Sequence, residues 1–113
     1  MMTRRIDKAE FKVRVAHWAE RLDTKPCAVA VRSMSTKWAS YSTSGRLTFD
    51  AQLLELPQAL QDYVIVHELL HVHVPNHGKL WKSLMRAHLG NYETHEKRLQ
   101  KLAAASHKKM AQK

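Results

Sequence analysis

Residues 64–71 read VIVHELLH and contain the pattern H-E-x-x-H inside an apolar segment. Because residues four apart in a helix lie one turn above each other, His67 and His71 face the same side and can bind one Zn²⁺. Glu68 follows the first histidine and flanks the metal, where it can accept a proton from metal-bound water. The other residues of the stretch are uncharged, as a helix packed under a dry cleft requires. The stretch therefore predicts a buried helix that carries a zinc-binding pair and a general base.

A catalytic zinc site needs a third protein ligand and an open fourth position. His77 lies six residues after His71 and would face away from the metal if the helix continued. Pro75 disfavours helical geometry in the residue before it, and Asn76 tolerates a left-handed turn. We therefore expect the chain to fold back and bring His77 to the metal, which gives the spacing H-x3-H-x5-H of three-histidine zinc peptidases.

The other candidate third ligands are Glu93 and Glu96, which fall in a later predicted helix and would act as in zincins with a glutamate ligand. His73 is two residues past His71, about 200° around the helix, so it is expected to point away. The remaining histidines are expected at the surface or behind the ligands: His17, His88, His95 and His107. Trp18, Trp38 and Trp81 are expected in the core.

Hydrophobic periodicity and turn residues predict the elements around this stretch. We expect a helix near 6–23, strands at 27–31, 37–42 and 46–49 with a turn at 43–45, and helices at 57–73, 76–89 and 92–106. The predicted fold is a single α+β domain over residues 1–113, with an amino-terminal helix, a small, mainly antiparallel three-stranded sheet, the active-site helix and two carboxy-terminal helices.

Composition narrows the class of protein further. The chain has 113 residues, 19 Lys and Arg against 10 Asp and Glu, 8 His and 1 Cys. A single cysteine excludes an internal disulfide and a cysteine-rich zinc site. With no secretory signal and no apolar run long enough for a bilayer, we expect a cytoplasmic protein with no membrane partner. Residues 78–113 hold nine Lys and Arg against two acids, and the basic tail at 103–113 contributes to this excess.

Several blocks of the sequence resemble the YgjP-like metallopeptidase domain, a zincin-type family related in design to SprT-like proteases. The blocks cover about residues 32–95 and comprise residues 37–40, 44–47, Leu54, Pro57, 62–71, 76–78 and 80–81. The sequence departs from the family at Ala39, where glycine is usual, and at Tyr41, where cysteine is frequent. Val74 stands where three-histidine zinc peptidases usually have glycine. An apparent helix also replaces the amino-terminal sheet region of many members, as in minimal zincin domains.

The resemblance implies a zinc-dependent peptidase with one zinc ion bound by His67, His71 and His77, and with Glu68 as general base. Its substrate would be a peptide or protein, which could pair with an edge strand at 37–42. Tyr92 is a candidate stabiliser of the oxyanion.

Two other functions remain open. A nucleic-acid-associated protein, including a DNA-linked protease of SprT-like type, would bind DNA or RNA through the basic carboxy-terminal region. A zinc hydrolase of phosphoesters ranks last, because the sequence lacks the additional carboxylates of a two-metal site.

Overall fold

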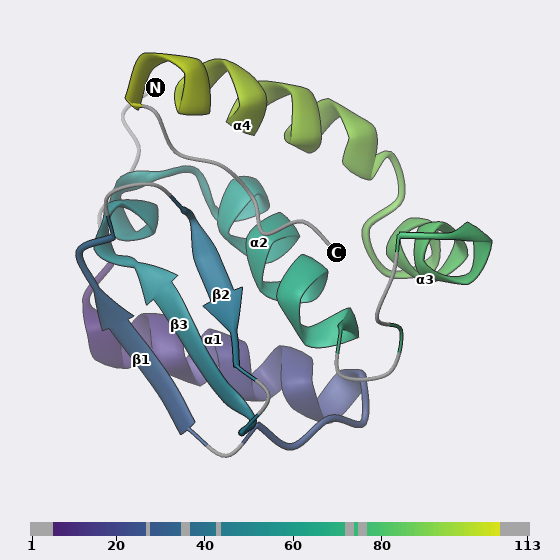
Figure 1. Ribbon diagram of the computed structural model, residues 1–113, viewed down its shortest axis with the longest axis horizontal. Coiled ribbons are helices and arrows are strands. Elements are labelled where there is room, and N and C mark those ends of the chain that lie inside the picture. Colours follow the sequence, from purple (N-terminus) through teal and green to yellow (C-terminus); the bar gives the residue numbers. More distant parts are fainter. Residues whose placement is uncertain are drawn as a thin grey trace.

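The computed structural model describes residues 6–26, 28–34, 37–42, 44–71, 74 and 77–106, with side chains as far as residue 102. The elements follow in the order α1 (Lys8–Arg21), β1 (Ala28–Arg32), β2 (Ala39–Tyr41), β3 (Arg46–Asp50), a 3-10 helix (Ala51–Glu55), α2 (Gln58–Leu70), α3 (Lys79–Leu89) and α4 (Tyr92–Ser106). Figure 1 shows α2 in the middle of the molecule, with the strands on one side of it, α3 on the other and α4 across the top. The predicted α+β class, with one amino-terminal helix and two helices after the histidine helix, is confirmed.

The sheet has three strands in the order β1-β3-β2. Strands β2 and β3 form the predicted hairpin, closed by the hydrogen bond from Ser42 N–H to the carbonyl of Arg46 and by Gly45 at φ +92°. Strand β1, however, pairs parallel with β3 along its whole length, from Ala28 opposite Arg46 to Arg32 opposite Asp50. The expectation of a mainly antiparallel sheet was therefore wrong: the sheet is mixed, because β3 inserts between the two earlier strands. Strand β2 lies at an edge.

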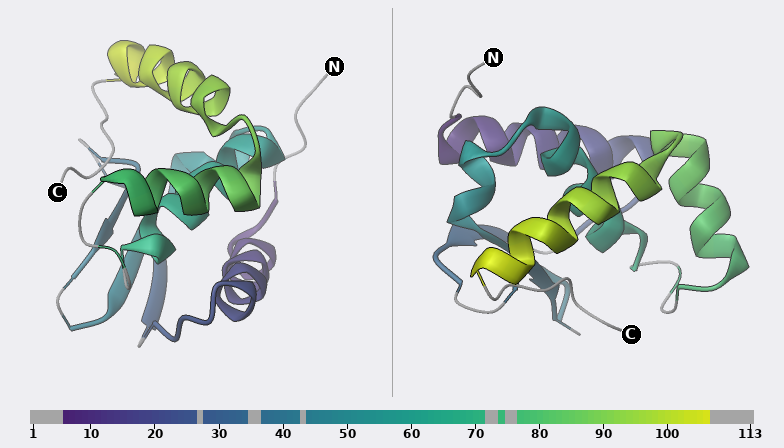
Figure 2. Two further views of the ribbon diagram at one scale, coloured as in Figure 1. Left: turned by 90° about the vertical axis from the view of Figure 1, so that its right-hand side faces the viewer. Right: turned by 90° about the horizontal axis from the view of Figure 1, so that it is seen from above.

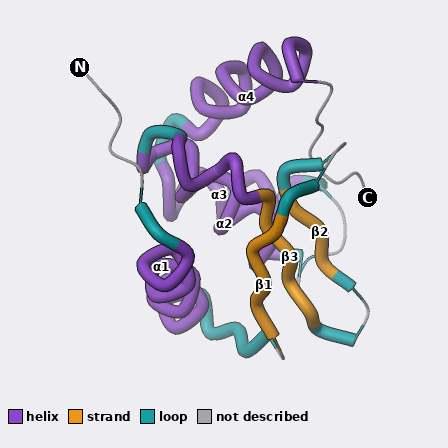
Figure 3. Tube along the Cα trace, turned by 90° about the vertical axis from the view of Figure 1, so that its left-hand side faces the viewer, coloured by secondary structure: helices purple, strands orange, loops and turns teal. Residues whose placement is uncertain are grey.

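Helix α1 begins where Asp7 accepts a hydrogen bond from the backbone N–H of Glu10 at 2.8 Å, which satisfies a free donor of the first turn. It lies against one face of the sheet (Figure 3), where the ring of Phe11 meets the ring of Phe49 edge-on at 5.2 Å. Phe11, Val15, Trp18 and Ala19 form its buried face. The amphipathic spacing of α1 therefore decides which side of the helix packs on the sheet.

Helix α2 is buried on nearly every side. The buried residues are Leu60, Gln61 and all of 63–70. An all-round apolar helix is a core helix rather than a surface one. Helices α1, α3 and α4 and strand β2 all contact it, and the two views of Figure 2 show α3 and α4 passing over it from different directions. Such a position shields the polar side chains in the second half of α2, His67 and Glu68, from water.

The helix ends differ from the sequence expectations by a few residues. Helix α2 ends at Leu70, with His71 as its cap, rather than at residue 73, and α3 begins at Lys79, after Gly78, rather than at 76. Val74 N–H donates to the carbonyl of Leu70 at 2.8 Å. Gly90, at φ +66°, ends α3 as predicted, because its N–H reaches the carbonyl of Arg86 from a conformation that side chains disfavour. None of the described helices is long and apolar enough to cross a bilayer.

Candidate metal centre

Three histidine side chains converge beside α2. Each of His67, His71 and His77 offers one ring nitrogen, and these nitrogens all lie within 4.8 Å of one another. His67 is inside the last turn of α2 and His71 caps it, so the helix itself aligns this pair. His77 comes from the segment just before α3. Among the described residues, no other group of His, Cys, Asp or Glu is arranged to hold a metal ion.

The geometry of the cluster fits a small metal ion. Nε2 of His77 lies 3.0 Å from Nε2 of His71. Tetrahedral zinc with Zn–N bonds of about 2.0–2.1 Å holds its nitrogen ligands roughly 3.3 Å apart. Nδ1 of His71 lies 3.3 Å from the carbonyl of Val74, so a proton on Nδ1 leaves the lone pair of Nε2 directed at the cluster. A backbone carbonyl that fixes the tautomer in this way is a frequent feature of metal-bound histidines.

The site favours neutral imidazoles, which are the form that binds metal. His67 is 3 % exposed, and burial, followed by the neighbouring His71 and His77, lowers its pKa to about 3. Burial also lowers the pKa of His77, although the charge of Glu96 opposes that effect. Nδ1 of His67 is buried and makes no hydrogen bond to a described residue. Three imidazole nitrogens around one point match the ligand preferences of a borderline-soft divalent ion such as zinc.

Glu68 is fully buried next to this cluster, with Oε1 3.9 Å from Nδ1 of His67. Glu68 directly follows His67 in α2, so its side chain leaves the helix about 100° around the axis from that of His67, next to the face that His67 and His71 share. The structure thus brings together the four residues singled out from the sequence: His67, Glu68, His71 and His77. Their roles as ligands and base remain predictions.

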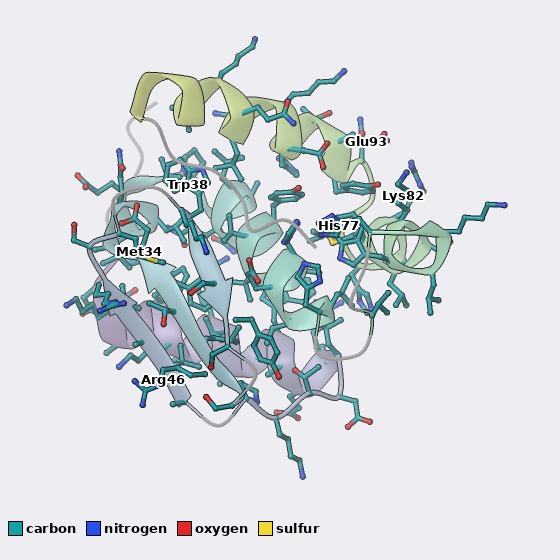
Figure 4. The ribbon with its side chains drawn as sticks, viewed as in Figure 1. Met34, Trp38, Arg46, His77, Lys82 and Glu93 are labelled. Atoms are coloured by element: carbon teal, nitrogen blue, oxygen red, sulfur yellow. The ribbon has the colours of Figure 1, made fainter. Side chains whose placement is uncertain are left out.

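The two glutamates considered as alternative third ligands have other partners. Glu93 is exposed and pairs with Arg86, its Oε1 being 3.2 Å from the guanidinium. Glu96 accepts a hydrogen bond from the hydroxyl of Tyr63 at 3.1 Å. Figure 4 shows Glu93 apart from His77, which lies at the α3 side of the site near Lys82. Neither glutamate joins the group of convergent ligand atoms among the described residues.

Two aromatic side chains, Tyr63 and Trp81, pack against the histidines, and the sequence predicted a role at the site for neither of them. Tyr63, one turn before His67 in α2, has its ring 5.8 Å from that imidazole. Burial raises the pKa of the Tyr63 hydroxyl, and Glu96 adds to the effect, so the phenol keeps its proton as a donor. The i, i+4 spacing of Tyr63 and His67 was the signal available in the sequence. Trp81 is buried, as predicted for a core residue, but it also contacts the cluster.

Tyr92, the candidate oxyanion stabiliser, is 3 % exposed and packs edge-on against Trp81, with the ring centroids 5.9 Å apart. Burial raises the pKa of its hydroxyl, with Glu93 and Glu96 adding to that effect. A protonated phenol can donate a hydrogen bond, as the predicted role requires. That role stays a prediction.

The other described histidines, His17, His88 and His95, lie outside the cluster. His17 is exposed, and His88 is half-buried with its ring edge against Trp18 at 6.4 Å. His95 is half-buried on α4. The expectations for His73, His107 and the turn at Pro75 and Asn76 lie outside the described residues.

The family model for the YgjP-like metallopeptidase domain matches residues 1–102 of the chain. The chain belongs to this family. It is therefore a metallopeptidase, a peptidase that works through a metal ion, and the match extends well beyond the residues that carry the resemblance in sequence. No curated protein matches the chain.

Two solved structures share the fold of this family member. The metallopeptidase zymogen jannalysin of Methanocaldococcus jannaschii has 24% identity and a TM-score of 0.72, over 84% of this chain and 96% of that one. The metallopeptidase zymogen abylysin of Pyrococcus abyssi has 20% identity and a TM-score of 0.71, over 89% of this chain and 99% of that one. At these identities the likeness concerns the arrangement of helices and strands.

Proposed function

We propose that the chain is a zinc-dependent peptidase that binds one zinc ion through His67, His71 and His77 and uses Glu68 as general base. The observation that carries the proposal is the convergence of three imidazole nitrogens within 4.8 Å, beside a buried carboxylate on the same helix. When bound, zinc supplies Lewis acidity, which polarises a peptide carbonyl and lowers the pKa of water. Three neutral imidazoles leave the full charge of the ion available for this purpose.

Glu68 would move the proton. As a carboxylate it accepts one from the attacking water at Oε1 or Oε2, and it passes that proton to the amine that leaves. Its burial removes competing water and strengthens its electrostatic interactions with the reacting groups. The low pKa of His67 keeps that ring neutral, so it does not compete with Glu68 for the proton near neutral pH.

The substrate would approach from the side of His77. His67, Glu68 and His71 are all buried, whereas His77 is half-buried. Strand β2 lies at the edge of the sheet and contacts α2, so an extended peptide could pair with its free backbone groups and pass close to the helix. We expect a peptide or unfolded protein to bind in this way.

The test compares Glu68→Gln with the wild-type chain. Metal analysis of both proteins should find near-stoichiometric zinc, because Gln keeps the shape of the side chain and no ligand changes. Cleavage of an unfolded protein should fall by about 100-fold or more in the variant, which is the usual contribution of a general base.

Glu93→Gln is the matched control, because it removes a carboxylate that is exposed and ion-paired on α4. This variant should cleave at the wild-type rate. Full activity of Glu68→Gln would contradict the role of the base, and a wild-type chain that binds no zinc would contradict the proposed ligand set.

A second candidate function is nucleic-acid binding by α3 and α4, favoured by the positive charge on their outer surfaces. Six exposed cations lie on these helices: Lys79, Lys82, Arg86, Lys97, Arg98 and Lys101. Of the two described acids on these helices, Glu93 pairs with Arg86, one of the six cations, and Glu96 accepts a hydrogen bond from Tyr63. The surface therefore keeps a large net positive charge, which suits a polyanion.

This candidate predicts that DNA or RNA binding weakens steeply with salt, because each phosphate contact releases counterions. Replacing Lys97, Arg98 and Lys101 together by alanine should lower affinity and the salt slope. The same change at Lys8 and Lys12, exposed on α1, should alter neither. Binding that is absent or insensitive to salt would contradict this candidate.

A further inference from the structure

The ring of Trp81 touches all three histidines of the metal centre. Its centroid lies 4.5 Å from that of His77, 5.1 Å from that of His67 and 6.5 Å from that of His71. The indole is 3 % exposed and comes from α3. None of the three candidate ligands belongs to that helix. One buried side chain of a separate helix thus contacts every candidate ligand.

The three contacts differ in geometry in a way that constrains each imidazole. The ring of His71 is stacked on Trp81 at an interplanar angle of 17°, and that of His67 meets it edge-on at 79°. The ring of His77 is tilted at 51° and is the nearest of the three. Offset stacking and edge-to-face contact are the favoured arrangements of aromatic rings, so rotation of an imidazole out of its present orientation would lose a favourable contact.

Trp81 is itself held by a chain of rings that returns to α2. Tyr92 meets Trp81 edge-on at 5.9 Å and stacks on Tyr63 at 6.4 Å with an angle of 11°. Tyr63 in turn lies 5.8 Å from His67 and donates to Glu96 of α4. The indole of Trp81, which α3 carries, therefore packs against His67 of α2 and against Tyr92 of α4.

His77 needs such support more than the other two histidines. Helix α2 sets the relative position of His67 and His71, but His77 precedes α3 and is not part of a helix. A side chain outside regular structure keeps more rotamer freedom, which must be lost when a metal binds. A ring packed at 4.5 Å restricts that freedom before binding.

We propose that Trp81 is a positioning residue of the metal centre: its indole holds the three imidazoles, and His77 above all, with their nitrogens convergent. This inference rests on the proposed ligand set and adds a residue that acts through those ligands rather than on the metal. Residues that orient metal ligands from behind typically change metal affinity by about 10–100-fold when removed.

The experiment measures the affinity of the full chain for Zn²⁺ by competition with a chromophoric chelator, and the visible spectrum of the Co²⁺-loaded protein. Trp81→Leu should lower affinity by about 10–100-fold and weaken the absorption typical of tetrahedral cobalt. Trp81→Phe should stay within about threefold of wild type. It keeps an aromatic ring at this position, although a smaller one, and the indole N–H that it loses makes no hydrogen bond to a described residue.

Trp38→Leu is the control for loss of a buried indole. Trp38 is 1 % exposed and lies at the sheet side of α2 in Figure 4, well apart from His77. Urea unfolding of the metal-free variants gives the stability lost by each, and affinities are compared where all are folded. We expect Trp38→Leu to lose stability while it keeps wild-type affinity and the wild-type cobalt spectrum.

The inference is overturned if folded Trp81→Leu binds within about threefold of wild type. Equal losses of affinity in Trp81→Leu and Trp38→Leu, or in Trp81→Leu and Trp81→Phe, would also overturn it. A wild-type chain that binds neither metal would instead overturn the proposed function, so the two failures are distinguishable.

Discussion

Helix α2 carries polar side chains that meet other elements at two places, and their partners differ in kind: Asp62 is half-buried, and His67 is buried. Near its start, Asp62 accepts hydrogen bonds from Arg14 and from the indole of Trp18, which lies 3.0 Å away, both on α1. Near its end, His67 faces two further imidazoles, and its Nδ1 makes no hydrogen bond to a described residue. The first cluster pairs a carboxylate with a guanidinium and an indole N–H, whereas the second gathers electron-pair donors around one point.

The difference separates a structural cluster from a binding site. A carboxylate paired with a guanidinium stabilises the contact between two helices and needs nothing from outside. Each of three clustered imidazoles can direct a lone pair at one point, and a single cation can accept all three of these lone pairs at once. We therefore expect substitutions in the histidine cluster to change metal affinity, and substitutions at Asp62 to change stability.

The largest effect is expected for His77→Ala. Loss of one of three proposed ligands should lower zinc affinity by about 100-fold or more, which exceeds the effect of removing an orienting residue. His77 is half-buried and outside the helices, so the metal-free variant should unfold near the wild-type urea concentration. Chelator competition and urea titration measure the two quantities, and unchanged zinc affinity would remove His77 from the ligand set.

Asp62→Asn should give the opposite result. Removing the charge that Arg14 and Trp18 contact should lower the free energy of unfolding by about 2 kcal/mol, because hydrogen bonds to charged groups contribute about 1.5–3 kcal/mol. Zinc affinity measured on the folded variant should equal that of wild type. A variant that loses zinc affinity but no stability would mean that the contact between α1 and α2 serves the metal centre.

The pH dependence of stability should reveal the buried imidazole. The pKa of His67 is lowered to about 3 in the fold from 6.5. As the pH falls below that unfolded value, the unfolded chain gains a proton that the folded chain does not, so stability decreases with falling pH. The expected loss is about 2 kcal/mol between pH 7 and pH 5, at about 1.4 kcal/mol per pKa unit.

Urea titrations at both pH values, in the presence of a chelator, measure this loss. Glu68, His71 and His77 face His67 and also respond to pH, so His67→Leu should remove part of the slope. An unchanged slope in that variant would assign the pH dependence to other groups.

The smallest effect is expected for Glu93→Gln. It breaks the pair with Arg86, whose two side chains are 60% and 53% exposed. Exposed ion pairs contribute about 0–1 kcal/mol, so urea unfolding should shift by less than that amount. A loss of unfolding free energy larger than that of Asp62→Asn would show that this surface pair stabilises the protein more than the contact at Asp62.

Local sequence signals predicted much of the fold. Gly90 marks the end of α3 because capping depends on a few neighbouring residues. The pairing of β1 was not predictable in the same way. A strand's apolar pattern gives its face but not its neighbour, and the parallel pairing with β3 depends on a strand that arrives later in the chain.

The same distinction applies to the site. The sequence by itself determined that His67 and His71 face one side of a buried helix with Glu68 beside them, because helical periodicity is a local property. Only the tertiary structure decided that His77 joins them while Glu93 and Glu96 do not, and that Trp81 packs against all three rings. These contacts depend on how α3 and α4 pack on α2, and packing is set by the shapes of side chains far apart in the sequence.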